Sequence, residues 1–241
     1  MRFEVLPFER IHTIAASFLK FIRTILACLL FLHQNLVLKS LETVANQEQY
    51  LNSLDSAVGD GDHGTTVARG MRSAIEELQK QDYETLNAIN VVVGESMMDA
   101  MGGASGVLYC VFFRAARKCD TYTELTLDAF YNFVSRGLEE LKRRSGAEAG
   151  DKTMLDALIP AVDTVRQHLE AGNTDLIAAL QEVAQAARQG SDSTKEMTAR
   201  FGRAKFLGER ALNNVDPGSV SIAILFESFC ENAKSLAEAS K

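Results

Sequence analysis

The sequence predicts an all-α domain, and three features support this prediction. Apolar residues recur three and four positions apart along most of the chain, as they do on one face of a helix. No segment alternates apolar and polar residues for long enough to indicate a half-buried strand. The 241 residues include only 3 prolines, so long helices can run without interruption. We therefore expect one domain of about eight core helices with short links and no internal repeat.

The first 33 residues differ from the rest and are expected to form an extra N-terminal helical segment. They carry four basic and two acidic residues, although the whole chain has a net charge of −7. Their apolar run from Ile25 to Leu32 is much shorter than the ~20 residues that span a bilayer. Three interpretations stay open: a helix packed on the domain or on a partner, a targeting segment, and a membrane anchor. The first is favoured, because Glu4 and Glu9 are unusual in a targeting presequence.

The domain itself is expected over residues 34–241, and its helices follow one another in order. Leu36, Leu41, Val44 and Leu51 recur at helical spacing and support the first of them. The β-branched run at 91–93 is the only candidate for a strand, but it lies inside a helical period and has no partner run nearby. The predicted helices cover residues 36–51, 65–80, 84–101, 104–118, 126–143, 153–170, 174–190 and 218–238.

Charge and cysteine content exclude several classes of protein. With 25 basic and 32 acidic residues, the chain is a poor general binder of nucleic acid, because phosphate contacts need a basic surface. The 4 cysteines form no Cys-x-x-Cys pair, so they suggest neither a zinc site nor a disulfide framework. Free cysteines are typical of a reducing compartment, and we expect the protein in the cytoplasm.

An acidic, glycine-rich loop joins the first two predicted helices of the domain. It contains Asp55, Asp60 and Asp62, and glycines at 59, 61 and 64 let the backbone turn tightly enough for three carboxylates to converge. Carboxylate oxygens are preferred ligands of Mg²⁺, and the free N–H groups at the start of the next helix favour an anion. The loop therefore predicts a site for a metal ion together with a phosphate.

Two other loop types fit less well. The spacing Gly59-x-Gly61-x-x-Gly64 matches a dinucleotide fingerprint, but no strand precedes it. An EF-hand loop counted from Asp60 fails, because its fifth and twelfth positions hold Gly64 and Met71. His63 is open to three roles: metal ligand, acid–base group, or partner of a nucleotide. Its place beside the loop acids and a helix start favours contact with the ligand.

Four motifs occur in an order that resembles one known family, the nucleotide-binding L subunits of dihydroxyacetone kinase (DhaL). The resemblance covers residues 35–240. The motifs are Asp55-x4-Asp60-Gly61-Asp62-His63-Gly64-Thr65-Thr66, then Gly102-Gly103-Ala104-Ser105-Gly106, then Gly150-Asp151-Lys152-Thr153-Met154-x-Asp156, and finally Gly202-Arg203 with Asp216-Pro217-Gly218.

The resemblance implies a barrel of about eight antiparallel helices with the nucleotide site in the loops at one end. It implies that Asp55, Asp60 and Asp62 hold two Mg²⁺ ions on the phosphates of ADP or ATP, and that Arg203 completes the catalytic set. The other nucleotide-binding residues implied are His63, Gly64, Thr65 and Thr66 at the phosphates, Ala104 and Ser105 at another part of the nucleotide, Met154 at the base, and Asp216, Pro217 and Gly218 closing the site.

The implied activity is that of a phosphotransferase that forms half of an enzyme. It would move a phosphoryl group from the Mg²⁺-bound nucleotide to dihydroxyacetone held on a separate K subunit. A chain without a K domain favours the version in which ADP stays bound and a phosphoenolpyruvate-dependent phosphotransferase subunit recharges it. The alternatives are a glycerone kinase domain with exchangeable ATP, and a nucleotide-loaded regulatory module that binds a transcriptional regulator. A homodimer is a further expected arrangement, and nucleic acid is not an expected partner.

Overall fold

The computed structural model describes residues 8–239, apart from the side chains of residues 8–19 and of Ala104. Within this range the chain forms helices and no strand, which confirms the predicted all-α class. Three short 3₁₀ segments accompany the α-helices: η1 (Ala115–Lys118), η2 (Thr194–Glu196) and η3 (Ala204–Ala211). The α-helices are α1 (Phe8–Ala45), α2 (Glu48–Asp55), α3 (His63–Leu78), α4 (Leu86–Ala100), α5 (Gly103–Arg114), α6 (Leu127–Ser145), α7 (Leu155–Glu170), α8 (Leu176–Ser193) and α9 (Pro217–Ala239).

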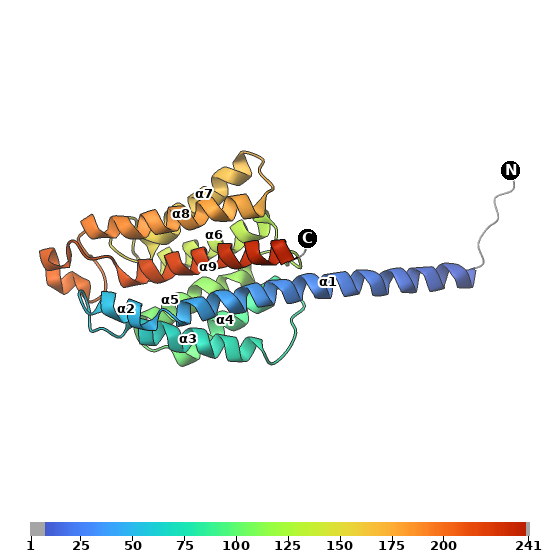
Figure 1. Ribbon diagram of the computed structural model, residues 1–241, viewed down its shortest axis with the longest axis horizontal. Helices are drawn as coiled ribbons and strands as arrows, with labels where there is room; N and C mark the ends of the chain where they lie inside the picture. The colour runs from blue at the N-terminus through green and yellow to red at the C-terminus, as the bar shows by residue number, and fades with distance from the viewer. Residues whose placement is uncertain (1–7, 240–241) are drawn as a thin grey trace.

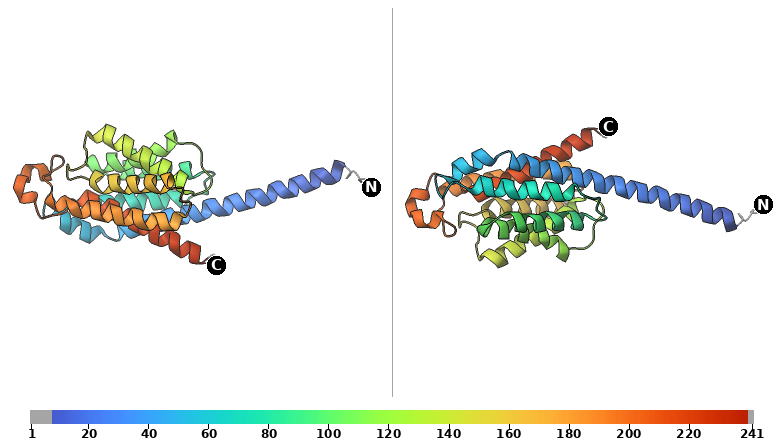
Figure 2. Two further views of the ribbon diagram at one scale, coloured as in Figure 1. Left: turned by 90° about the horizontal axis from the view of Figure 1, so that it is seen from above. Right: turned by 90° about the horizontal axis from the view of Figure 1, so that it is seen from below.

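Eight of these helices close into a barrel (Figure 1). Around the ring, α1 packs on α3, α3 on α4, and each later helix on the next, until α9 packs on α1 again. Neighbours in the ring run antiparallel (Figure 2). Their inward faces form one core, in which Leu41, Met71, Leu158 and Val183 are fully buried. The predicted arrangement of about eight antiparallel helices is thus confirmed.

One predicted helix is divided in two. The periodicity over 36–51 predicts a continuous helix, but α1 ends at Ala45 and α2 begins at Glu48. A turn at Asn46 and Gln47 separates them, and it lets α2 lie across the end of the barrel against α3 and α9. Leu51 of α2 is buried there, so both halves keep the apolar spacing that suggested one helix.

Helix α1 reaches far beyond the barrel (Figure 1). It runs without a break across the predicted boundary between residues 33 and 34, and Leu30 is the first of its described side chains to be buried. From Gln34 onward the helix is fixed to α3, because the Gln34 amide donates to the backbone oxygens of Leu78 (2.6 Å) and Gln81 (3.2 Å). One stretch of the described residues, Lys20–Ala45, is long and apolar enough to cross a membrane by length and composition.

Four links gather at the end of the barrel opposite the free part of α1 (Figure 1). They join α2 to α3, α4 to α5, α6 to α7, and α8 to α9, and they contain the four glycine-rich motifs of the sequence. The alternating direction of the helices therefore brings these distant segments together.

Candidate functional site

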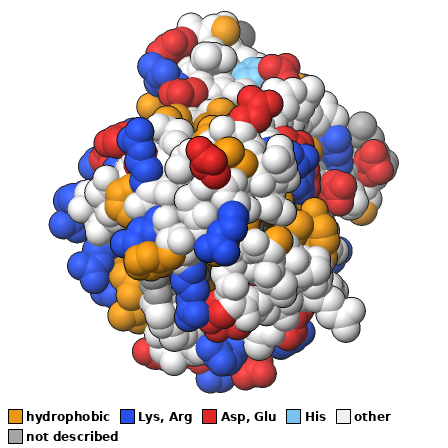
Figure 3. Space-filling model, turned by 90° about the vertical axis from the view of Figure 1, so that its left-hand side faces the viewer, with side chains coloured by type: hydrophobic (Ala, Val, Ile, Leu, Met, Phe, Trp, Pro, Cys, Tyr) orange, Lys and Arg blue, Asp and Glu red, His pale blue; other side chains and the backbone are white. Residues whose placement is uncertain are grey.

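The four links surround a cavity of about 800 Å³. This volume is typical of small-molecule sites, which range over ~300–1,000 Å³. Figure 3 views this end of the molecule and shows acidic and basic side chains side by side on its surface. The predicted site residues that line the cavity are Asp55, Asp60, Asp62, His63, Thr66, Ser105, Met154, Arg203, Asp216, Pro217 and Gly218.

The three loop aspartates converge at this cavity. Asp55, Asp60 and Asp62 each bring a carboxylate oxygen within 4.8 Å of the other two. Asp55 is the last residue of α2, and its Oδ2 accepts hydrogen bonds from the backbone amides of Asp62 (2.9 Å) and His63 (3.2 Å). These bonds fold the loop back onto α2 and fix the position of one carboxylate. Hard cations take carboxylate oxygens, so the cluster fits a divalent metal ion such as Mg²⁺.

Glycine is needed at two positions of this loop. Gly61 has a φ of +78°, a left-handed conformation that favours glycine. A Cβ atom at Gly59 would collide with the carboxylate of Asp55. The glycines noted in the sequence therefore allow the convergence of the acids, as their spacing suggested.

Arg203 comes to the cluster from the long link between α8 and α9. Its Nη1 lies 2.5 Å from Oδ2 of Asp60. Gly202, with a φ of +65°, turns the chain immediately before it. The Arg203 side chain is 68% exposed and that of Asp60 34%, so solvent screens the pair. Arg203 can therefore leave Asp60 for another anion at little cost, and its planar guanidinium is suited to a phosphate.

His63 is held by a network at the start of α9. Its Nε2 lies 3.1 Å from Oγ of Ser221, which also accepts a hydrogen bond from the Tyr109 hydroxyl (2.8 Å). The Ser221 hydroxyl donates its single hydrogen to the carbonyl oxygen of Gly218 (2.9 Å). In its contact with His63 the serine oxygen is therefore the acceptor, and Nε2 of His63 is the donor. Burial lowers the pKa of His63, against the opposing effect of Asp55 and Asp62. The hydrogen bond to Ser221 therefore orients the ring within the cavity wall.

The start of α3 is less open than the sequence suggested. The amide of Thr65 donates to Oδ1 of Asn52 (3.0 Å) and that of Thr66 to the carbonyl of Asp62 (2.9 Å). The Thr65 hydroxyl is also bonded to α2, where it donates to Glu48 (3.0 Å). Gly64 is buried against the same helix. Thr66 alone of these three lines the cavity, and the predicted contact of Gly64 and Thr65 with phosphates stays a prediction.

The start of α5 presents a second helix end to the cavity. Gly102 precedes the helix and no side chain caps it, while Gly103 has a φ of +70°. Both glycines and Ser105 line the cavity. Ala104 lies in the first turn, and its side chain is outside the described residues. Uncapped N–H groups at a helix start favour an anionic group of a ligand.

The segment Asp216-Pro217-Gly218 lies opposite Met154. Met154 is buried, and a Cβ atom at Gly218 would lie 3.6 Å from the Cβ atom of Met154. Asp216 caps α9, since its Oδ2 accepts a hydrogen bond from the amide of Ser219 (2.6 Å). Burial raises the pKa of Asp216 to about 7, because the Ser219 amide and Lys152 only partly offset the loss of solvent and the nearby Asp156.

A buried lysine that sequence reasoning did not single out holds this end of the barrel together. Lys152 is only 2% exposed, and its Nζ donates to the backbone oxygens of Thr194 (2.5 Å) and Asn214 (2.6 Å). It thus ties both ends of the α8–α9 link to the α6–α7 link. The neighbouring Asp156 fixes its own loop by accepting from the amides of Gly150 (2.5 Å) and Thr153 (2.7 Å).

Two further arginines line the cavity and were missed. Arg69 of α3 donates through Nε to the carbonyl of Ala100 (2.8 Å), and Arg144 lies in the last turn of α6. The signal for Arg69 was present, because it lies three residues after Thr66, on the same face of the same helix. Arg144 is brought near only by the barrel closure.

The fold and the site define a helical-barrel domain that carries a carboxylate cluster, suited to a metal ion, in the loops at one end. Comparison with known proteins agrees with this class. The DAK2 domain family matches residues 57–231. The ADP-binding subunit DhaL of the PEP-dependent dihydroxyacetone kinase of Escherichia coli (strain K12) is 35% identical over 191 residues, which cover 79% of this chain and 90% of that protein.

Two more relatives complete the comparison. The ADP-binding subunit DhaL of the PTS-dependent dihydroxyacetone kinase of Lactococcus lactis is 34% identical over 190 residues, covering 79% of this chain and 91% of that protein. The crystal structure of the dihydroxyacetone kinase from C. freundii in complex with AMP-PNP and Mg²⁺ superimposes with a TM-score of 0.63 at 31% identity. That match covers 82% of this chain but only 33% of the crystallised one.

The chain belongs to the DAK2 domain family, within the group of dihydroxyacetone kinase L subunits. Its relatives are named as kinases, so it falls in a class of phosphotransferases.

Proposed function

We propose that the chain is the ADP- or ATP-binding subunit of a dihydroxyacetone kinase and transfers a phosphoryl group to dihydroxyacetone held on a separate K subunit. The observation that carries this proposal is the convergence of three carboxylates and Arg203 at a cavity large enough for a nucleotide. The E. coli and L. lactis relatives support it, because they are ADP-binding subunits of similar length.

Asp55, Asp60 and Asp62 would hold two Mg²⁺ ions, since they supply enough carboxylate oxygens in one place. Bound there, the ions would neutralise the phosphate oxygens and clamp the reacting group. The neighbour crystallised with AMP-PNP and Mg²⁺ supports a nucleotide with metal at this site.

The residues of this chain then have distinct tasks. Arg203 exchanges its exposed pairing with Asp60 for a phosphate oxygen, which places a cation on the transferred group. The uncapped start of α5 at Gly102 and Gly103 receives a second anionic group. Met154 offers an apolar contact for the base, and Asp216-Pro217-Gly218 closes the opposite side. Phosphoryl transfer depends on such positioning and charge neutralisation more than on covalent chemistry by the protein.

The proposal also concerns the source of the phosphoryl group. We infer that ADP stays bound and is recharged by a phosphoenolpyruvate-dependent phosphotransferase subunit, because the two subunit relatives carry PEP-dependent or PTS-dependent in their names. The alternative is a domain with exchangeable ATP, which the match to about a third of the C. freundii kinase favours. We place these activities in the cytoplasm.

A regulatory role is the second candidate function, since a nucleotide-loaded module that binds a transcriptional regulator would keep the same site. Affinity purification with the full chain distinguishes the two. Recovery of a K-type subunit supports the kinase, and recovery of a regulator without a K subunit supports the alternative. The same preparation shows by sedimentation whether the chain is a homodimer.

The direct test is formation of dihydroxyacetone phosphate by the full chain together with a K subunit, Mg²⁺ and either ATP or a phosphoenolpyruvate-driven donor. We expect product only when both subunits are present, and none with Asp60→Asn. Asp82→Asn is the matched control, because Asp82 is an exposed aspartate in the α3–α4 link, away from the site. Product from Asp60→Asn at the wild-type rate would contradict the metal assignment.

A further inference from the structure

The part of α1 before Leu30 has no partner among the described residues. Figures 1 and 2 show it projecting alone from the barrel in every view. Its apolar side chains face solvent: Phe21 is 60% exposed and Ile25 41%. Farther along, Phe31 is 57% exposed although Leu30 beside it is buried. Exposed large apolar side chains that share one face of a helix, as Phe21 and Ile25 do, mark an interaction surface.

The exposed part of the helix has two distinct faces. Phe21, Ile22, Ile25 and Leu29 lie at positions that share one face of a helix with 3.6 residues per turn. In the sequence, the same spacing continues back to Ile11, Ile14 and Phe18. On the opposite face, the described positions before Leu30 are Lys20, Arg23, Thr24 and Ala27. Over residues 20–29 the helix is therefore amphipathic, and its polar face is basic.

The charge of this segment contrasts with that of the barrel. Lys20 and Arg23 are exposed, and neither forms an ion pair with another described residue. The first 33 residues are net positive, while the chain as a whole carries −7. A surface that binds this helix needs an apolar layer for the apolar face and negative charges beside that layer for Lys20 and Arg23. An anionic lipid bilayer has this structure.

The helix is too short in its apolar part to cross the bilayer. The stretch without charge that precedes the barrel is Thr24–Leu32, which at 1.5 Å per residue spans about 13 Å, against a hydrocarbon core of ~30 Å. The remaining apolar residues of the Lys20–Ala45 segment, such as Leu36, Leu41 and Val44, are buried in the barrel core. Moving them into lipid would dismantle the core. The geometry is that of a helix lying in the plane of the surface.

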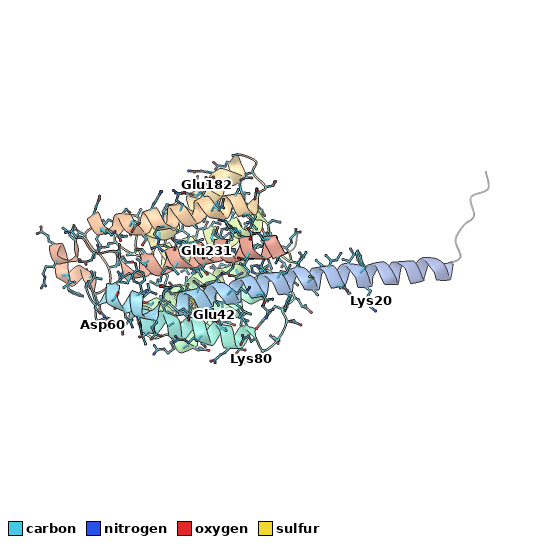
Figure 4. The ribbon with its side chains drawn as sticks, viewed as in Figure 1. Lys20, Glu42, Asp60, Lys80, Glu182 and Glu231 are labelled. Atoms are coloured by element: carbon cyan, nitrogen blue, oxygen red, sulfur yellow. The ribbon has the colours of Figure 1, made fainter. Side chains whose placement is uncertain are left out.

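We propose that the N-terminal part of α1 binds an anionic membrane surface, with its apolar face in the lipid and Lys20 and Arg23 at the headgroups. Figure 4 shows Lys20 on the projecting part of the helix and Asp60 at the opposite end of the molecule. Because α1 is continuous, a chain bound in this way lays the barrel alongside the surface, and the aspartate cluster stays at the end of the barrel farthest from the bound segment, open to a partner subunit. This inference does not depend on the phosphoryl donor or on the kinase activity.

Vesicle co-sedimentation of the full chain tests the proposal. The vesicles are phosphatidylcholine alone, or phosphatidylcholine with roughly 30% phosphatidylserine. We expect at least a tenfold preference for the anionic vesicles at low salt, and a loss of binding as salt is raised. Lys20→Glu with Arg23→Glu should weaken binding about tenfold or more, and Ile25→Glu should reduce it to the level of the neutral vesicles.

Two variants serve as matched controls. Lys39→Glu reverses an exposed lysine of the same helix where it lies on the barrel, and Met98→Glu places an acid at an exposed apolar residue of α4. Both should bind vesicles as the wild type does. Circular dichroism confirms that all variants remain folded. Equal binding of Ile25→Glu and wild type would overturn the proposal. So would absence of vesicle binding together with a dimer that Ile25→Glu dissociates, because the face would then be an interface between two copies.

Discussion

Lys152 shows at the residue scale how one buried cation can position a site. Its Nζ is the shared donor for the carbonyls of Thr194 and Asn214, at the two ends of the α8–α9 link that carries Arg203. Lys152→Met keeps the length of the side chain but leaves both oxygens without this donor. We expect a loss of about 2–4 kcal/mol in the free energy of unfolding, measured in urea. Lys195→Met, at an exposed neighbour 3.5 Å from Asp192, should change it by less than ~1 kcal/mol. Equal losses would show that Lys152 does not hold the link.

Asp216 gives the site a pH dependence. Its pKa is raised to about 7 by burial, so between about pH 4 and 7 the folded protein binds more protons at this group than the unfolded chain does. The stability that the protonated form contributes is therefore lost as pH rises through this range. Asp216→Asn cannot titrate, and its amide oxygen can still accept from the Ser219 amide. With chelator present, we expect the variant to gain about 2–3 kcal/mol relative to wild type between pH 5 and 8. A difference that is constant across pH would contradict the raised pKa.

Asp60 is the residue that tests the proposed metal site most cleanly. Its removal leaves the fold intact, because its ion pair with Arg203 is partly exposed and worth ~0–1 kcal/mol. Calorimetric titration with ADP and Mg²⁺ should show at least a tenfold loss of affinity for Asp60→Asn, since one charged ligand is gone. Asp82→Asn should bind as the wild type does. Unchanged binding by the Asp60 variant would remove this carboxylate from the site.

Some site residues could be found from the sequence and others could not. The three aspartates lie within eight positions of one another, so a local glycine pattern was enough to predict that they converge. Lys152 contacts segments far away in the chain, and Arg144 lines the cavity beside such segments. No local sequence pattern predicts contacts of this kind. The fixed donor role of His63 likewise depends on Ser221, which lies 158 residues away.

Close packing between two helices explains why residue 64, which the resemblance places at the phosphates, is a glycine. At the element scale, Gly64 of α3 packs against α2, and a Cβ atom there would collide with the carbonyl oxygen of Glu48. Gly64→Ala should separate the two helices and lower the free energy of unfolding by about 2–4 kcal/mol. Gly102→Ala is the control for stability, because Gly102 has a φ of −88° and open space around its Cα. Thermal melting measures both, and similar melting temperatures would show that the contact is not close.

The positions at which helices end, and the short segments between them, were predicted least accurately. The predicted helix over 36–51 hides the turn at Asn46 and Gln47, because the apolar spacing continues through it. The segment η3, which packs beside Arg203, was not predicted either, since a short 3₁₀ segment carries no periodic signal. By contrast, the seven later helices of the barrel appear close to their predicted ranges, because each buries one face along its whole length.

At the scale of the whole molecule, helix number and short links were enough to predict an all-α domain, and the barrel closure followed from the resemblance. The order of packing around the ring brings four separate motifs to one end. The sequence also marked residues 1–33 as different, but only the structure shows one continuous helix. It packs on the barrel from Leu30 onward, and its described side chains before Leu30, from Lys20 to Leu29, are not buried. The molecule thus has a nucleotide-type site at one end and an amphipathic arm at the other.

The central claim is that the cavity at the end of the barrel binds an adenine nucleotide with Mg²⁺. Its most direct test is to purify the full chain without added nucleotide, denature it, and identify by chromatography and metal analysis what it releases. We predict stoichiometric ADP with Mg²⁺ from the wild type and from Asp82→Asn, and neither from Asp60→Asn. A wild-type chain that releases no nucleotide, and that then binds neither ADP nor ATP in the presence of Mg²⁺, would contradict the account.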